Sequence, residues 1–105
     1  MSLSQDQLLA ILDAQLTQDE RARADVYVKS GIVGAGTAFQ VPRLTIPVPS
    51  DALIAFVDRQ PAANWGHECR YVLVIRDTGD VQSFEARFPP WGDGGKSEWK
   101  KRGAV

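Results

Sequence analysis

Cysteine, histidine and long apolar runs are all scarce in this sequence. A single cysteine, Cys69, excludes an intramolecular disulfide, which is typical of a protein that folds in a reducing compartment. One cysteine and one histidine, His67, cannot supply the four ligands of a structural zinc site, so we expect no metal and no cofactor. The longest apolar runs, residues 52–57 and 71–75, are far shorter than the roughly 20 residues that cross a bilayer, and no membrane association is expected.

The sequence also lacks an excess of charge of either sign, because the net charge is −1 over 105 residues. Without a positive field the chain has no general attraction for nucleic acid, and we expect no such partner. The first residues lack the basic and apolar regions of a signal peptide, which indicates a cytoplasmic protein. Acidic residues gather near the start and basic residues near the end, which indicates either a partner contact or two solvated ends.

The first predicted element is a helix over residues 5–16. Ser4 and Gln7 have the spacing of a capping box, and the apolar residues that follow recur at the helical period. A second capping box begins at Thr17, with a glutamate three residues later. The helix therefore either breaks at this point or runs on to about Ala24.

The rest of the chain reads mainly as strands. Strands are predicted for residues 25–33, 37–41 and 52–59 and for the two arms of a hairpin within 69–88. The glycines of residues 34–36 make a loop of hairpin length, and Gly79 supplies the positive φ of a tight turn. Three prolines in residues 42–50 predict an edge strand or an extended connector. Residues 52–59 are apolar on both faces, as a central strand requires.

These elements predict an α+β domain, with an N-terminal helix packed on a four- or five-stranded, mainly antiparallel sheet. The alternative is a small open β-barrel or sandwich with one helix. The length fits one hydrophobic core, and we assign residues 1–91 to a single domain. Residues 92–105 are rich in glycine and lysine and are expected to form a flexible basic tail, unless Trp91 and Trp99 pin it to the body.

The clearest candidate chemistry lies at Cys69. If residues 67 and 69 share a strand, their side chains lie on one face about 6–7 Å apart, which is too far for direct proton transfer without a bend. Tyr71 continues that face, so we expect Cys69 to be core filler between helix and sheet. The alternative is a cysteine-dependent enzyme, in which His67 is the base for Cys69 and Asp58 orients the imidazole.

Arginine and tryptophan side chains suggest a binding surface instead. Trp65, His67, Arg70 and Trp91 are predicted to gather near one loop at an end of the sheet. If Arg59, Arg70 and Arg87 meet at one end of the sheet, they would hold a carboxylate or phosphate. The alternative is ion pairing across strands with Glu68, Asp58 or Glu85. The leading hypothesis is thus a small non-enzymatic binding or interaction module. Its partner would be a protein, a second copy of the chain, or a small anionic ligand.

Overall fold

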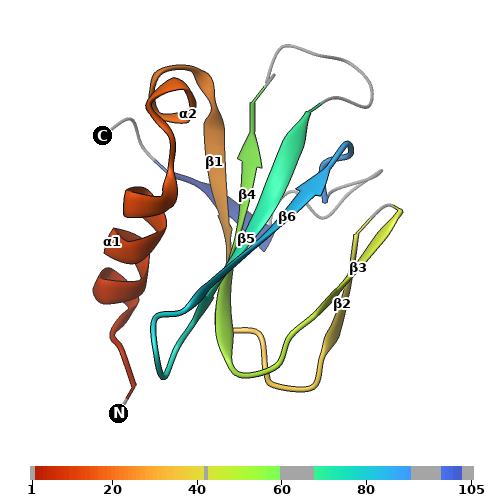
Figure 1. Cartoon of the computed structure of the whole chain (residues 1–105). Coiled ribbons are helices and arrows are strands. Elements are labelled where there is room, and N and C mark those ends of the chain that lie inside the picture. The colour runs from red at the N-terminus through yellow and green to blue at the C-terminus, as the bar shows by residue number, and fades with distance from the viewer. Residues whose placement is uncertain (1, 42, 60–67, 91–97, 103–105) are drawn as a thin grey trace.

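The computed structural model describes residues 2–41, 43–59, 68–90 and 98–102, and within them two helices precede seven strands (Figure 1). The helices are α1 (Gln5–Gln15) and α2 (Gln18–Arg23). The strands are β1 (Asp25–Lys29), β2 (Ala38–Val41), β3 (Leu44–Pro47), β4 (Ala52–Asp58), β5 (Cys69–Ile75), β6 (Val81–Ala86) and β7 (Trp99–Lys101).

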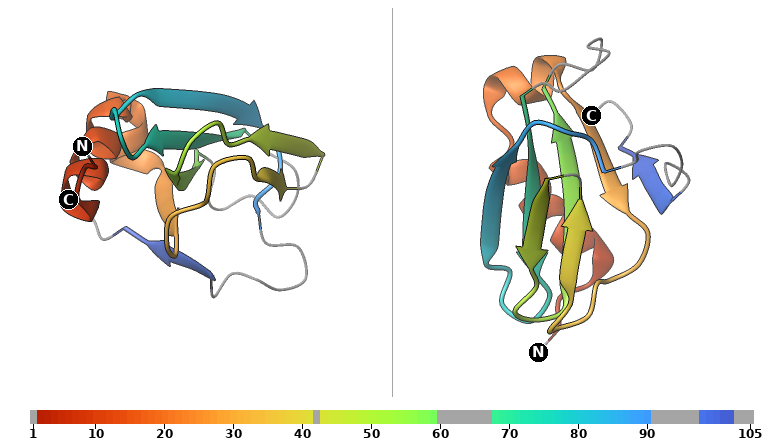
Figure 2. Two further views of the ribbon diagram at one scale, coloured as in Figure 1. Left: turned by 90° about the horizontal axis from the view of Figure 1, so that it is seen from below. Right: turned by 90° about the vertical axis from the view of Figure 1, so that its right-hand side faces the viewer.

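The α+β prediction is confirmed. Five strands form an antiparallel sheet in the order β6-β5-β4-β1-β7, and β2 pairs with β3 in a separate two-stranded sheet. The large sheet is open, so the chain is not a closed barrel. The helices cover one face of this sheet and the β2–β3 hairpin covers the other, which gives three layers (Figures 1 and 2).

Two capping boxes divide the N-terminal segment into two helices. The Ser4 hydroxyl accepts a hydrogen bond from the Gln7 backbone amide, and the Ser4 backbone amide donates one to the Gln7 side-chain oxygen. Thr17 and Glu20 repeat this arrangement at the start of α2. The second box therefore starts a new helix, which resolves the choice left open by the sequence.

The two central strands, β4 and β5, are buried along their whole length. Successive side chains of each strand point to opposite faces of the sheet and contribute to two separate hydrophobic cores, one on each face. Leu53, Ala55 and Val57 meet the helices, whereas Phe56 faces the β2–β3 hairpin and packs against Tyr71 at a ring-centroid distance of 5.2 Å. The prediction that residues 52–59 form a central strand is therefore confirmed.

The turn between β5 and β6 contains a glycine in a conformation that favours this residue. Gly79 has a φ of +78°, a conformation that other residues rarely adopt. A Cβ added there would also lie 2.9 Å from the Ile11 side chain of α1. The helix thus packs directly against the turn that the sequence predicted.

One predicted pairing does not form. The glycine loop at residues 34–36 does not join a hairpin, because β1 pairs with β4 and β7 and not with β2. The loop instead carries the chain from the large sheet to the second layer, where β2 pairs with the proline-flanked β3. A two-stranded sheet leaves one edge of β3 unpaired, which is where a strand ending in Pro47 is tolerated.

The described part of the segment 92–105 lies in the large sheet. β7 pairs with β1, and Trp99 is 7% exposed and contacts Phe39 edge-on at 6.1 Å. Residues 98–102 are therefore not a flexible tail. Trp99 pins them to the body, which is the condition under which the sequence predicted order. Burial of the indole and the unpaired edge of β1 together explain why this short strand docks.

The acidic start and the basic end of the chain meet within the molecule. Lys101 lies 3.4 Å from Asp25, and Arg102 lies 2.5 Å from Asp13. The uneven charge distribution seen in the sequence is therefore accounted for in part by contacts between β7, α1 and β1. Among the residues described, no helix is long and apolar enough to cross a membrane.

Candidate functional site

Cys69 begins β5 and lies in the core on the hairpin side of the sheet. It is fully buried in a row with Tyr71, Leu73 and Ile75, as the strand alternation predicted. The expectation that it lies between helix and sheet is wrong in one respect, because odd-numbered positions of β5 face the β2–β3 hairpin. The helix face is formed by the even-numbered positions, which include Arg70.

The surroundings of the Cys69 thiol keep it protonated. Burial, together with the negative charge of Asp58, raises its pKa to about 12. Asp58 is directly opposite Cys69 in the β4–β5 register, so two members of the predicted triad do come together. The sulfur donates a hydrogen bond to the Phe88 carbonyl at 3.7 Å. This environment opposes formation of the thiolate that nucleophilic chemistry needs.

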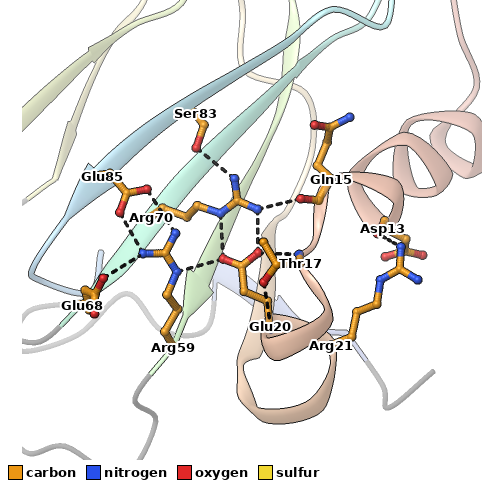
Figure 3. A network of polar contacts seen from close by, with 10 residues as sticks. All are labelled: Asp13, Gln15, Thr17, Glu20, Arg21, Arg59, Glu68, Arg70, Ser83 and Glu85. Atoms are coloured by element: carbon orange, nitrogen blue, oxygen red, sulfur yellow. Dashed lines mark hydrogen bonds and ion pairs between the residues drawn. The ribbon is translucent and has the colours of Figure 1, made fainter.

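Three of the predicted site residues, Trp65, His67 and Trp91, lie outside the described residues. The fourth, Arg70, lies at the centre of a polar network on the helix face of the sheet (Figure 3). It is only 9% exposed, and its guanidinium points toward α2 and not toward solvent.

Glu20 of α2 is the partner that anchors this network. The Arg70 guanidinium donates to both oxygens of Glu20, from Nε at 2.9 Å and from Nη2 at 2.8 Å. Arg59 donates from Nε to Glu20 Oε2 at 2.9 Å, and the Thr17 amide donates to Oε1 at 2.9 Å. The carboxylate of Glu20, 3% exposed, thus accepts four charge-assisted hydrogen bonds, three of them from guanidinium groups.

All three guanidinium nitrogens of each arginine donate hydrogen bonds. Arg70 donates to the Ser83 hydroxyl at 3.1 Å and to the Gln15 carbonyl at the end of α1 at 2.9 Å. Arg59 makes a two-pronged contact with Glu85, at 2.8 and 3.1 Å. We call Glu20, Arg59, Arg70 and Glu85 the Glu20 hub; it ties both helices to β4, β5 and β6.

Electrostatics in the Glu20 hub favour the charged forms. Burial acts to raise the pKa of Glu20, but hydrogen bonds from Thr17, Arg70 and Arg59 outweigh it, and the net pKa is lowered. The hydrogen bonds from Arg59 lower the pKa of Glu85 as well. Arg59 pairs with Glu68 and Glu85, as the ion-pair alternative predicted, whereas Arg70 pairs with Glu20, which that alternative did not include.

The Glu20 hub could be foreseen only in part from the sequence. Thr17 and Glu20 have the spacing of a capping box, and alternation along residues 69–75 puts Arg70 on the face opposite Cys69. The pairing of Glu20 with Arg70, 50 residues apart, has no local sequence signal.

A pocket of about 630 Å³ lies on the other side of α2. It is lined by residues 20–26 together with Asp13, Leu16, Lys101 and Arg102, and we call it the α2–β7 pocket. Four cationic side chains and three carboxylates share its wall with apolar surface from Leu16 and residues 22–26. Sequence reasoning missed this site, because β7 was predicted as part of a tail.

Within the part of the chain that the structure describes, no three histidine, cysteine, aspartate or glutamate side chains are grouped so as to hold a metal ion. Comparison with protein-family models, with curated proteins and with solved structures found no match. The function must therefore be inferred from the chemistry of the side chains.

Proposed function

We propose that this chain is a non-catalytic binding domain that recognises a small ligand in the α2–β7 pocket. The observation that carries the proposal is the pocket itself. Its volume of about 630 Å³ falls within the range of roughly 300–1,000 Å³ that small-molecule sites occupy. It also combines apolar surface with converging charged groups, as such sites do.

The surroundings of the candidate nucleophile favour binding over catalysis. A thiol with a pKa of about 12 is protonated at neutral pH, and the charge of Asp58 disfavours the thiolate. All three guanidinium nitrogens of Arg70 donate to Glu20, Ser83 or Gln15, so Arg70 is not part of the proposed ligand surface. The α2–β7 pocket replaces the predicted patch as the centre of recognition.

The proposal can be tested with the full chain labelled with ¹⁵N. A set of neutral, anionic and cationic fragments at millimolar concentration should include compounds that shift the backbone amide signals of residues 21–26 and 102. Ala22→Trp, an exposed residue of the pocket wall, should abolish those shifts by filling the pocket.

The matched control is Ala14→Trp, which places the same side chain on an exposed position of α1 outside the pocket wall. It should leave fragment binding intact. If no fragment shifts the pocket signals, or if both variants bind as the natural chain does, the α2–β7 pocket is not the ligand site.

A further inference from the structure

Resting on the proposed function, we infer that the ligand of the α2–β7 pocket carries an oxyanion, a carboxylate or a phosphate, on a short apolar body. The inference rests on arginines of the pocket wall that have unused N–H donors and lie beside apolar wall residues. The ligand is a small molecule, because the volume of about 630 Å³ is that of a small-molecule site.

The arginines of this protein fall into two groups with different degrees of engagement. In the Glu20 hub, Arg59 and Arg70 each make a two-pronged contact with a carboxylate. In the pocket, Arg102 contacts Asp13 through Nη2 alone, and its buried Nε has no hydrogen-bond partner. A guanidinium held by one prong can rotate to present its second edge to an incoming oxyanion.

Two further arginines of the pocket wall have no carboxylate partner among the described residues. Within the described residues, Arg21 donates only to the Asp13 carbonyl, at 2.9 Å, and Arg23 forms no ion pair. Both are exposed and lie in the last turn of α2, where positive charge offsets the partial negative charge of the helix end. That role needs no fixed contact, so their donors stay available to a ligand.

The carboxylates of the wall do not reverse this positive character. Asp13 is paired with Arg102, and Asp25 is paired with Lys101. Glu20 is neutralised from the opposite side by arginines of the hub that do not line the pocket. The charge left for a ligand is that of the two α2 arginines, which selects for an anion.

The apolar part of the wall defines the rest of the ligand. Leu16, Ala22, Ala24 and Val26 line the same pocket. The pocket can therefore cover a short hydrocarbon chain or ring while the arginines hold the head group. Apolar burial and charge-assisted hydrogen bonds would then act on different parts of one molecule.

Three probes of equal chain length separate the contributions: hexanoate, hexanamide and hexylamine. Titration into the ¹⁵N-labelled full chain is followed at the backbone amides of residues 21–26 and at the Nε–H signal of Arg102. Hexanoate should bind at least about fivefold more tightly than hexanamide, which corresponds to a contact free energy near 1 kcal/mol. Hexylamine should bind most weakly.

Arg23→Gln should weaken hexanoate binding about threefold to tenfold and leave hexanamide binding unchanged. Arg87→Gln is the matched control, because it removes the same charge from an exposed residue beyond β6, at the opposite edge of the sheet from β7. It should leave all three affinities unchanged.

The outcomes distinguish this inference from the proposal beneath it. Equal or tighter binding of hexanamide or hexylamine would overturn the oxyanion inference and leave the pocket as a binding site. Equal loss of hexanoate affinity in both arginine variants would overturn it too, since a general charge effect would then explain the preference. If no probe shifts the pocket signals, both the inference and the proposed site fail.

Discussion

Glu20→Gln is the substitution that tests the structural account most directly. Glutamine has nearly the same size and keeps an oxygen that can accept the Thr17 amide, so the capping box is retained. What changes is the negative charge that faces Arg59 and Arg70. The amide group of glutamine also turns a donor toward one of the guanidinium groups.

The expected loss of unfolding free energy is large for a single polar substitution. Removing one partner of a buried, hydrogen-bonded ion pair costs about 3–5 kcal/mol. Arg59 keeps Glu85, and Arg70 keeps Ser83 and Gln15, so we expect a value near the lower end, about 3 kcal/mol. A domain of this size is stable by on the order of 5–15 kcal/mol, so the loss would be plain in any unfolding curve.

Urea unfolding followed by tryptophan fluorescence measures this change, with the buried Trp99 as one reporter. For an m-value of about 1.5 kcal/mol per molar, the midpoint should fall by about 2 M. Glu98→Gln is the control, because Glu98 is 66% exposed and lies 3.5 Å from Lys29. Its effect should stay below about 1 kcal/mol.

The pH dependence supplies a second, independent readout. Because the pKa of Glu20 is lowered in the folded protein, the stability it contributes is present above its usual value of 4.5 and is lost as the pH falls below that. The difference between the natural chain and Glu20→Gln should therefore shrink on acidification. A difference no larger than that of Glu98→Gln at neutral pH would refute the assignment of Glu20 as an anchor.

Three further predictions concern other parts of the fold. Iodoacetamide should modify Cys69 only after denaturation, because the thiol is buried, and rapid labelling of the native protein would contradict this. Because burial also raises the pKa of the folded thiol, the free energy of unfolding should decline as the pH rises above 9 toward 12. Gly79→Ala should cost at least about 1–2 kcal/mol in thermal unfolding, whereas Gly34→Ala, with open space around it and no positive φ, should cost less than about 1 kcal/mol. Trp99→Ala should cost about 3 kcal/mol if β7 is part of the core, and an unchanged urea midpoint would show that the strand contributes nothing.

Local patterns in the sequence predicted the parts of this fold that depend on neighbouring residues. The capping box at Ser4, the apolar period of α1 and the turn at Gly79 all involve residues a few positions apart. Alternation along residues 69–75 likewise separated the face of Cys69 from that of Arg70. Such signals require no knowledge of which element lies opposite.

The features that the sequence did not predict all depend on distant partners. Strand β1 and the glycine loop after it resembled half of a hairpin, but β4 and β7 offered β1 a pairing on each side. Trp99 lies in a glycine- and lysine-rich segment, and its packing against Phe39 and against the edge of β1 depends on residues far away in the sequence. The α2–β7 pocket was missed for the same reason, since half of its cationic wall comes from β7 and the residue after it.

Glu20 belongs both to the Glu20 hub and to the wall of the α2–β7 pocket. Its carboxylate is buried in the hub, yet the same residue forms part of the pocket wall. Because the hub fixes α2 against β4 and β5, it also fixes the last turn of α2, where Arg21 and Arg23 lie. Arg59 and Arg70, which bind carboxylates on one side of this short helix, thus hold in place the less engaged Arg21 and Arg23 on the other. A six-residue helix has little stability of its own, so this anchorage is what can pre-organise the pocket before a ligand arrives.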